Sequence, residues 1–440
     1  MSKSVKNILT QYKNSGISIY DKPATTLWSE ICTRPVFDHT TLNLAVGKII
    51  KEVKDKGDIA LRKFAQKFDG VTIDQFLVSD AELKLATKNI SPSLKAAIQQ
   101  AKRNIEFFHR TQKEEVREIN ISKGITCWRE SRAIESVGLY IPGGSAPLFS
   151  TVLMLGVPAM IAGCKEVILC TPCDKNGKIN DAVFYAASIC KISKIFKIGG
   201  AQAIAAMAFG TDTISAVHKI FGPGNQYVTA AKQWVQNKVA IDMPAGPSEV
   251  LVIADDSCVP AFVASDLLAQ AEHGPDSQVM LVCTSKEIAN MVEKEIGKQM
   301  EDLPRKDIVA KSLKHSKFII LKNLNEAVAL SNLYAPEHLI LACRTSQRLL
   351  KQIVNAGSVF VGNYSPESAG DYASGTNHTL PTNGFAAMYS GVSLDSFYKK
   401  ITFQKLTKLG LQSLSNTIIT MAEAEGLQAH SNAVKKRISN

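Results

Sequence analysis

The sequence lacks the features of a secreted or zinc-ribbon protein. Its nine cysteines, among 440 residues, follow no regular spacing. Cys170-Thr-Pro-Cys173 is the only C-x-x-C pair, and no second pair accompanies it. The first residues, Met1 to Asn7, are polar, and no apolar segment follows them, so we expect no signal peptide. These absences favour a reducing compartment, and we expect a cytoplasmic protein.

One stretch also lacks charge, since no charged residue lies between Glu135 and Lys165. Prolines and glycines interrupt this stretch, at Pro142, Gly143, Gly144, Pro147 and Pro158. Such interruptions are typical of a buried strand, loop and helix rather than of a membrane span. We therefore expect no membrane insertion.

Dense clusters of positive charge are scarce as well. The chain has 51 Lys and Arg against 40 Asp and Glu, a net charge of +11, but its only basic run is the short Lys435-Lys-Arg437. The excess favours acidic ligands, and a phosphate-bearing cofactor meets that preference as well as nucleic acid does. We expect no nucleic-acid partner. A basic, non-catalytic nucleic-acid-binding protein is the alternative, and salt-dependent binding would reveal it.

The hydrophobic pattern changes character near residue 136. Residues 1–135 are predicted to be mainly helical, with apolar residues at helical spacing over 44–68 and 91–108. From Val137 to Val361, short apolar strands alternate with helices. This pattern predicts an α/β protein with two similar Rossmann-like domains, each an incomplete, doubly wound parallel sheet, plus N-terminal helices and a helical C-terminal tail. In such sheets ligands bind at the carboxyl ends of the strands.

Two glycine-rich loops follow predicted strands, at 142–147 and 222–225. Backbone N–H groups before a helix can bind phosphate. Neither loop is a complete G-x-G-x-x-G, because Tyr227 stands where the third glycine of the second loop should be. A simple turn is therefore the alternative at both places.

Polar residues that could carry chemistry lie at four places between or at the ends of the predicted apolar segments. Gln270 and His273 are three residues apart near the end of a predicted helix, where they could hold one cation or simply form a polar helix end. Glu337 and His338 are adjacent, a pairing suited to proton transfer. Asp371 lies in a long polar loop after the last strand, a setting typical of functional residues. Glu425 and His430 lie near the helical tail.

The chain resembles the histidinol dehydrogenase family over nearly its whole length. The resemblance is carried by eight motifs that occur in the family's order. They are Pro142-Gly-Gly-Ser-Ala-Pro147, Gly199-Gly-Ala-Gln-Ala203, Phe221-Gly-Pro-Gly-Asn225, Asp242-Met-Pro-Ala-Gly-Pro-Ser-Glu249, Gln270-Ala-Glu-His-Gly-Pro-Asp276, Pro336-Glu-His338, Ser368-Ala-Gly-Asp-Tyr-Ala-Ser-Gly-Thr-Asn-His378 and Glu425-Gly-Leu-Gln-Ala-His430.

The resemblance implies zinc-dependent oxidation of L-histidinol to L-histidine through L-histidinal, with reduction of two NAD. It implies one zinc per subunit, with ligands Gln270, His273, Asp371 and His430. It implies Glu337 and His338 as the catalytic pair, and NAD contacts from Tyr140, Gln202 and Asn225. The implied substrate contacts are Ser248, Gln270, His273, Glu337, His338, Asp371, Glu425 and His430.

The resemblance also implies a domain plan and a partner. An NAD-binding domain at 137–248 is inserted into a metal and catalytic domain formed by 1–136 with 249–390. Residues 391–440 form a dimerisation tail, which in a homodimer completes the partner's active site. The alternative enzyme is a cysteine-dependent aldehyde dehydrogenase-like protein using Cys164 or Cys127, although neither has an evident neighbouring base.

Overall fold

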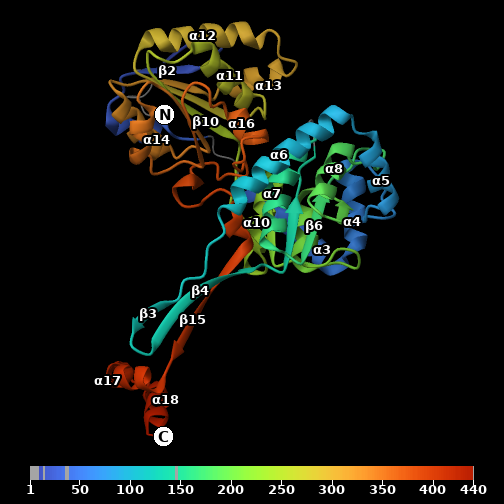
Figure 1. The fold of residues 1–440 in the computed structure, drawn as a ribbon. Coiled ribbons are helices and arrows are strands. Elements are labelled where there is room, and N and C mark those ends of the chain that lie inside the picture. The colour runs from blue at the N-terminus through green and yellow to red at the C-terminus, as the bar shows by residue number, and fades with distance from the viewer. Residues whose placement is uncertain (1–8, 13–14, 35–38, 144–146, 440) are drawn as a thin grey trace.

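The computed structural model describes residues 9–12, 15–34, 39–143 and 147–439. These residues form two bodies, each built on a sheet of parallel strands, and an arm that extends away from both (Figure 1). Residues 1–7, and the centre of the first predicted glycine loop at 144–146, lie outside the described residues.

The first body contains a seven-stranded sheet in the order β1-β2-β12-β11-β10-β13-β14. All neighbouring strands are parallel except β1 and β2, which are antiparallel. The strands are β1 (Leu9–Gln11), β2 (Ser18–Asp21), β10 (Glu249–Ala254), β11 (Gln278–Cys283), β12 (Lys317–Ile320), β13 (His338–Ala342) and β14 (Ser358–Val361).

Helices cover both faces of this sheet, so its central strands are apolar on both sides. Val250 and Val252 point to one core, which contains α11 (Pro260–Ala271), α12 (Lys286–Met300) and α13 (Lys306–Leu313). Leu251 and Ile253 point to the other core, which contains α2 (Trp28–Ile31), α14 (Leu324–Tyr334) and α15 (Ser346–Leu349). Successive side chains of a strand alternate between faces, which explains the continuous apolar run.

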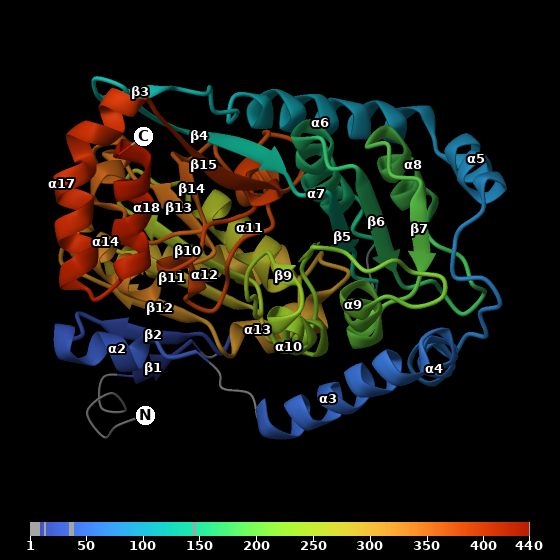
Figure 2. The ribbon, with the colours of Figure 1, turned by 90° about the horizontal axis from the view of Figure 1, so that it is seen from below.

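The second body contains a five-stranded, fully parallel sheet in the order β7-β6-β5-β8-β9. The strands are β5 (Ser136–Tyr140), β6 (Glu166–Thr171), β7 (Lys194–Lys197), β8 (Lys219–Phe221) and β9 (Ala240–Ile241). One face is covered by α5 (Asp80–Asn89), α6 (Pro92–Arg110), α7 (Phe149–Ala162) and α8 (Asp181–Ile189). The other is covered by α3 (His39–Lys56), α4 (Asp58–Phe64), α9 (Gly200–Phe209) and α10 (Gln226–Trp234) (Figure 2).

These two sheets confirm the predicted α/β fold, and the predicted strands are present with ends shifted by about one residue. The N-terminal region differs in three respects. It contains strands, β1 and β2, that we did not predict. The helix predicted over 44–68 is broken at Gly57, which has a positive φ of 52°. Helices α3 to α6 pack on the five-stranded sheet. We therefore propose grouping residues 39–110 with the second body, and the boundaries 137–248 and 391–440 remain predictions.

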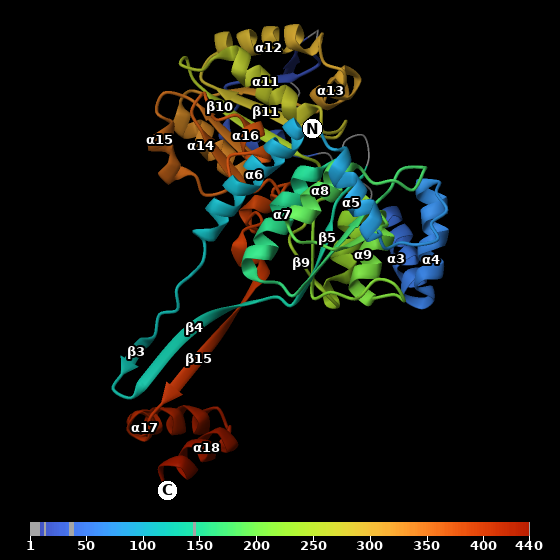
Figure 3. The same ribbon diagram turned by 45° about the vertical axis from the view of Figure 1, so that its right-hand side comes forward.

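The arm is an antiparallel sheet that the sequence did not reveal. It joins β3 (Ile119–Ser122), β4 (Ile125–Ala133) and β15 (Tyr398–Leu406), in the order β15-β4-β3. Nine residue pairs link β4 to β15, from Ile125 opposite Leu406 to Ala133 opposite Tyr398. The arm carries the predicted tail, helices α17 (Lys408–Ala424) and α18 (Gln428–Ile438), away from both bodies (Figures 1 and 3).

None of the helices in the described residues has the length and apolar character needed to cross a membrane. The uncharged stretch after Glu135 contains the strand β5 and the helix α7 that its pattern predicts.

Candidate active site

A glutamate and a histidine lie at the connection between helix α14 and strand β13. The helix ends at Tyr334, Ala335 adopts a left-handed conformation with φ 51°, and Pro336 follows. Glu337 and His338 come next, and His338 is the first residue of β13. Only 6% of Glu337 and 4% of His338 is exposed. The predicted proton-transfer pair is thus buried at the amino end of β13, a strand with a neighbour on each side.

The main-chain N–H and C=O of Glu249, at the start of the adjacent strand β10, contact these two residues. The N–H donates to Glu337 Oε2 (2.8 Å), and the carbonyl accepts a hydrogen bond from His338 Nδ1 (3.1 Å). The second bond assigns the imidazole proton to Nδ1 and leaves the lone pair on Nε2. Within the described residues this Nε2 is buried without a hydrogen-bond partner, and Asp371 Oδ1 lies 3.8 Å away. It is therefore available to accept a proton from a ligand.

Burial shifts the acid–base properties of the two residues in opposite directions. It raises the pKa of Glu337 well above its usual value, and the nearby carboxyl groups of Glu249 and Asp371 add to the rise. It lowers the pKa of His338 to about 3, and the nearby His273 acts in the same direction. The imidazole is therefore neutral at pH 7, and Glu337, when ionised, is a stronger base than an ordinary glutamate.

A group of potential metal ligands lies beside this pair. His273, Glu367 and Asp371 offer ligand atoms that all lie within 4.8 Å of one another. His273 follows the C-terminal end of α11, whereas Glu367 and Asp371 both belong to α16 (Glu367–Tyr372). Burial raises the pKa of Asp371 to about 7 and that of Glu367 well above its usual value. Crowded carboxyl oxygens with an imidazole nitrogen are a donor set that suits a divalent cation.

Gln270, in the last turn of α11, joins this group through Glu367. Its side chain is 1% exposed. The amide orientation that satisfies both groups directs its NH2 to the Glu367 carboxylate, with 3.1 Å to Oε2. Its carbonyl oxygen is then free to act as a ligand. The sequence analysis missed Glu367, although its i, i+4 spacing to Asp371 could have indicated a shared helix face.

The group formed by His273, Glu367 and Asp371, here called the metal-type group, does not lie at the carboxyl edge of the seven-stranded sheet, where we expected ligands. Glu249 and His338 begin their strands. Helix α11 starts beyond the carboxyl end of β10 and runs back, so its last turn brings Gln270 and His273 to the amino edge. The expectation is therefore wrong for this site, because returning helices and strand starts supply its side chains.

Two further polar residues border the site. Ser248 directly precedes β10, and its carbonyl accepts the N–H of Gln278 (3.1 Å). His378 donates from Nδ1 to the carbonyl of Asp371 (2.9 Å), and its Nε2 lies 3.1 Å from Thr151 Oγ1 in α7. Burial lowers the pKa of His378 to about 4, which keeps the ring neutral. His378, which the sequence analysis did not select, thus links the site to the second body.

Glu425 and His430 do not join the other predicted site residues within one chain. Glu425 caps the end of α17, His430 lies in α18, and both are exposed. Two views place these helices at the far end of the arm, well separated from α11 and α16 (Figures 1 and 3). Of the four predicted zinc ligands, a single chain therefore brings Gln270, His273 and Asp371 together and leaves out His430.

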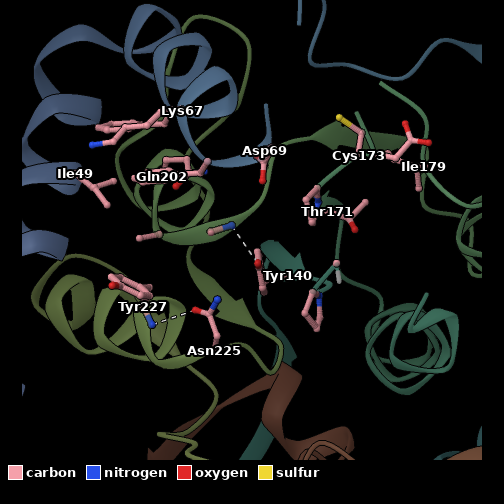
Figure 4. Close-up of a pocket in the computed structure, with 18 of the residues that line it drawn as sticks. Ile49, Lys67, Asp69, Tyr140, Thr171, Cys173, Ile179, Gln202, Asn225 and Tyr227 are labelled. Carbon is pink, nitrogen blue, oxygen red and sulfur yellow. Dashed lines mark hydrogen bonds between the residues drawn. The ribbon is translucent and has the colours of Figure 1, made fainter. Parts of the chain in front are cut away.

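A cavity of about 1540 Å³ opens at the carboxyl edge of the five-stranded sheet (Figure 4). Tyr140 at the end of β5, Gln202 in the first turn of α9 and Asn225 before α10 all line it. These are the three residues expected to contact the cofactor. Several basic side chains also line the cavity, namely Lys48, Lys63, Lys67, Lys175 and Lys178.

Local hydrogen bonds shape this cavity. The N–H of Gly200 donates to Tyr140 Oη (3.0 Å). Asn225 Oδ1 accepts the N–H groups of Tyr227 (3.0 Å, Figure 4) and Val228 (3.2 Å), so it caps α10, and its NH2 has no hydrogen-bond partner among the described residues. Gly222 has a positive φ of 128° and lies against the Tyr140 backbone. A side chain at Gly222 would clash there, so close packing explains this glycine.

The two cysteines of the alternative hypothesis are poor nucleophile candidates. Burial raises the pKa of the Cys164 thiol to about 11, which disfavours the thiolate. Cys127 lies in the arm strand β4, opposite Gln404 of β15. Neither residue lines the cavity described above.

Comparisons with known proteins agree with this geometry. Residues 32–438 match the family model described as histidinol dehydrogenase. The chain is 56% identical over 417 residues to a histidinol dehydrogenase of Bacteroides fragilis (strain YCH46), covering 94% of this chain and 97% of the relative. It is 51% identical over 413 residues to that of Yersinia pestis, covering 93% and 92%.

A solved structure gives the same result. The crystal structure of histidinol dehydrogenase from Elizabethkingia anophelis matches with a TM-score of 0.95 and 53% identity, covering 97% of this chain and 99% of that chain. The chain is therefore an enzyme of the histidinol dehydrogenase family.

Proposed function

We propose that this enzyme oxidises L-histidinol to L-histidine through L-histidinal, reducing two NAD per substrate, as the last steps of histidine biosynthesis. The observation that carries the proposal is the buried Glu337–His338 pair beside the His273, Glu367 and Asp371 group. A base next to a cation site suits oxidation of an alcohol whose neighbouring amine and imidazole are themselves ligands.

The residues present fit a zinc ion. Gln270, His273 and Asp371 would hold one zinc per subunit together with His430 of a second copy of the chain. The crowded carboxyl groups beside His273 favour a bound cation. Glu367 would orient Gln270 by accepting its amide N–H, as residues behind a metal ligand commonly do. When bound, zinc would act as a Lewis acid and a template for the substrate.

His338 would serve as the base in both oxidations. Its Nδ1–H is held by the carbonyl of Glu249, so a substrate hydroxyl group can deliver its proton to Nε2. In the first oxidation the proton comes from the alcohol of histidinol, and in the second from the hydrate of the aldehyde. In both oxidations the hydride would leave the same carbon atom of the substrate, and NAD, when bound, would supply its acceptor.

Glu337 would form the hydrate between the two oxidations. A carboxylate of raised pKa, held by the N–H of Glu249, can take a proton from the water that attacks the aldehyde. The remaining contacts to histidinol would come from Ser248, Gln270, His273, Asp371, Glu425 and His430. The aldehyde would stay among these side chains, which limits its escape.

The five-stranded sheet would bind NAD in its cavity. Tyr140, Gln202 and Asn225 line the cavity. Its wall carries lysines, which would attract the pyrophosphate, as well as the carboxylates of Glu52, Asp69, Asp174 and Asp181, so the proposal rests on the three polar residues rather than on charge alone. The cavity lies at the carboxyl edge of the strands, the usual position of dinucleotides in such sheets.

Asn225→Asp is expected to raise the dissociation constant of NADH about tenfold and leave the melting temperature unchanged. The aspartate oxygen still caps α10, but the free NH2 is lost and a negative charge faces the cofactor. NADH fluorescence titration and thermal unfolding measure the two effects. Asn323→Asp is the matched control, because Asn323 caps α14 in the same way. Unchanged NADH affinity for Asn225→Asp would remove Asn225 from the cofactor site.

We further propose a homodimer whose active sites are shared, in the cytoplasm. The arm and tail expose large apolar side chains, including Ile401 (40%), Leu409 (67%) and Met421 (60%). Burial of these side chains against a second copy would stabilise the dimer. The same contact would bring Glu425 and His430 to the site of the other chain.

The direct test of the function is NADH formation from L-histidinol and NAD. We expect two NADH per substrate consumed and a loss of activity on the order of 10²-fold or more after metal removal by EDTA, reversed by zinc. One NADH per turnover with free histidinal as the product would contradict the two-step reaction. Full activity in the chelated, metal-free protein would contradict the zinc assignment.

A further inference from the structure

Arg34 forms a buried ion pair next to the catalytic pair. Its Nη2 donates to Glu249 Oε2 (2.8 Å), and its Nε donates to Glu249 Oε1, so the contact is bidentate. The side chain of Glu249 is 2% exposed and that of Arg34 is 16% exposed. Two parallel hydrogen bonds fix both the position and the plane of a carboxylate. The ion pair therefore restrains Glu249, the residue whose main-chain N–H and C=O contact Glu337 and His338.

The same guanidinium also holds the segment that leads into the catalytic pair. Arg34 Nη2 donates to the carbonyl of Tyr334 (2.8 Å), and Arg34 Cζ lies 3.8 Å from the centre of the Tyr334 ring. Tyr334 is 1% exposed and stands three residues before Glu337. Arg34 thus reaches the pair by two routes, through Glu249 in β10 and through the end of α14.

A buried lysine fixes the segment that carries Arg34. Lys317 Nζ, at the start of β12, donates to the carbonyls of Ile31 (2.5 Å) and Thr33 (2.7 Å). Its side chain is buried, at 8% exposure, although no carboxylate accepts from it in the described contacts. Burying a charge is costly unless hydrogen bonds compensate it, and these two carbonyls provide such bonds. Lys317 therefore anchors the chain one residue before Arg34.

We propose that Arg34 is a positioning residue for the Glu337–His338 pair, acting through Glu249 and Tyr334. This inference rests on the proposed function. The N–H and C=O of Glu249 each bind one member of the pair, so a shift of the Glu249 backbone would displace both. A displacement of about 1 Å at reacting groups can cost about 10²-fold in rate.

The test compares Arg34→Met with Arg34→Lys, which keeps the charge but not the two-pronged contact. For Arg34→Met we expect kcat with histidinol to fall about 10²-fold, with KM for NAD and the dissociation constant of zinc changed less than about threefold. Arg34→Lys should recover part of kcat. The cofactor cavity and the metal-type group contain no contact to Arg34 among those described, which is why binding should persist. Arg344→Met, which breaks an exposed ion pair with Asp256, is the control and should leave kcat unchanged.

A double-mutant cycle separates positioning from general stability. In a Glu337→Gln/His338→Asn background, with enzyme in excess, Arg34→Met should lower the residual rate by less than about threefold, because the groups it positions are gone. An equal loss in both backgrounds would overturn the proposal, and so would failure of both Arg34 variants to fold. An inactive wild-type enzyme would instead count against the proposed function.

Discussion

His338→Asn is expected to slow the oxidation of both histidinol and histidinal, each by about 10²- to 10⁴-fold, the usual contribution of a general base. The asparagine NH2 can still donate to the carbonyl of Glu249, but the side chain has no basic nitrogen in place of Nε2. Single-turnover NADH formation, started from the alcohol and separately from the aldehyde, measures each step. His315→Asn, an exposed position after α13, is the matched control and should leave both rates unchanged.

Glu337→Gln provides the contrast within the same experiment. The amide oxygen can still accept the N–H of Glu249, so the position of the side chain should be retained. Alcohol oxidation should then stay within about tenfold of wild type, whereas oxidation of the aldehyde should fall about 10²-fold or more, because hydration loses its base. Equal losses in both steps for Glu337→Gln would contradict the separate roles of the two residues. A His338→Asn enzyme that oxidises the aldehyde at the wild-type rate would contradict the role of His338.

Mixing two inactive variants should restore activity if each site contains the tail of the other chain. His430→Ala removes a proposed zinc ligand, and Glu337→Gln/His338→Asn removes the proton-transfer pair. After subunit exchange, half of the dimers are mixed, and each has one complete site. The mixture should therefore reach about a quarter of the wild-type activity, starting from two nearly inactive parents. Steady-state NADH formation during exchange records the recovery.

The control replaces the second parent with a His430→Ala/Glu337→Gln/His338→Asn chain. This mixture contains no complete site in any dimer and should stay inactive. If the first mixture also stays inactive while mass spectrometry shows mixed dimers, the tail completes the site of its own chain and the shared-site proposal is wrong. That outcome would require a large rearrangement, because α17 and α18 follow β15 and lie at the far end of the arm (Figure 1).

Short-range patterns in the sequence were sufficient for most helices and strands of the two sheets. The continuous apolar run at the start of the second half predicts a strand buried on both faces, and β10 is such a strand. Ser91 and Pro92 predict a helix start, and Ser91 caps α6 through the N–H of Leu94. The proposed proton-transfer pair could also be recognised in the sequence, because Glu337 and His338 are neighbours in the chain. Residues that are close in sequence and share one helical turn or one strand form a pattern that a short window of sequence contains.

The unpredicted parts depend on residues far apart in the chain. Arg34 and Glu249 are 215 positions apart, and no local periodicity indicates that they meet. The arm pairs β4 with β15, and each strand alone reads as an ordinary polar segment. Glu367 becomes a candidate site residue only through the packing of α16 against the end of α11, which brings it to Gln270 and His273. Such contacts arise from the packing of whole elements, which no short window of sequence contains.

The sequence by itself determined the type of fold, and it indicated the residues of the proposed proton-transfer pair and most residue types of the metal-type group. Only the tertiary structure decided the edge of the sheet at which that group forms, because the edge depends on helices that return past the strands they follow. The tertiary structure also carried Glu425 and His430 away from the rest of the site, since the ladder between β4 and β15 holds the tail at a distance. Residue identity is a local property, whereas the meeting of residues depends on hydrogen bonds and apolar contacts summed over the whole chain.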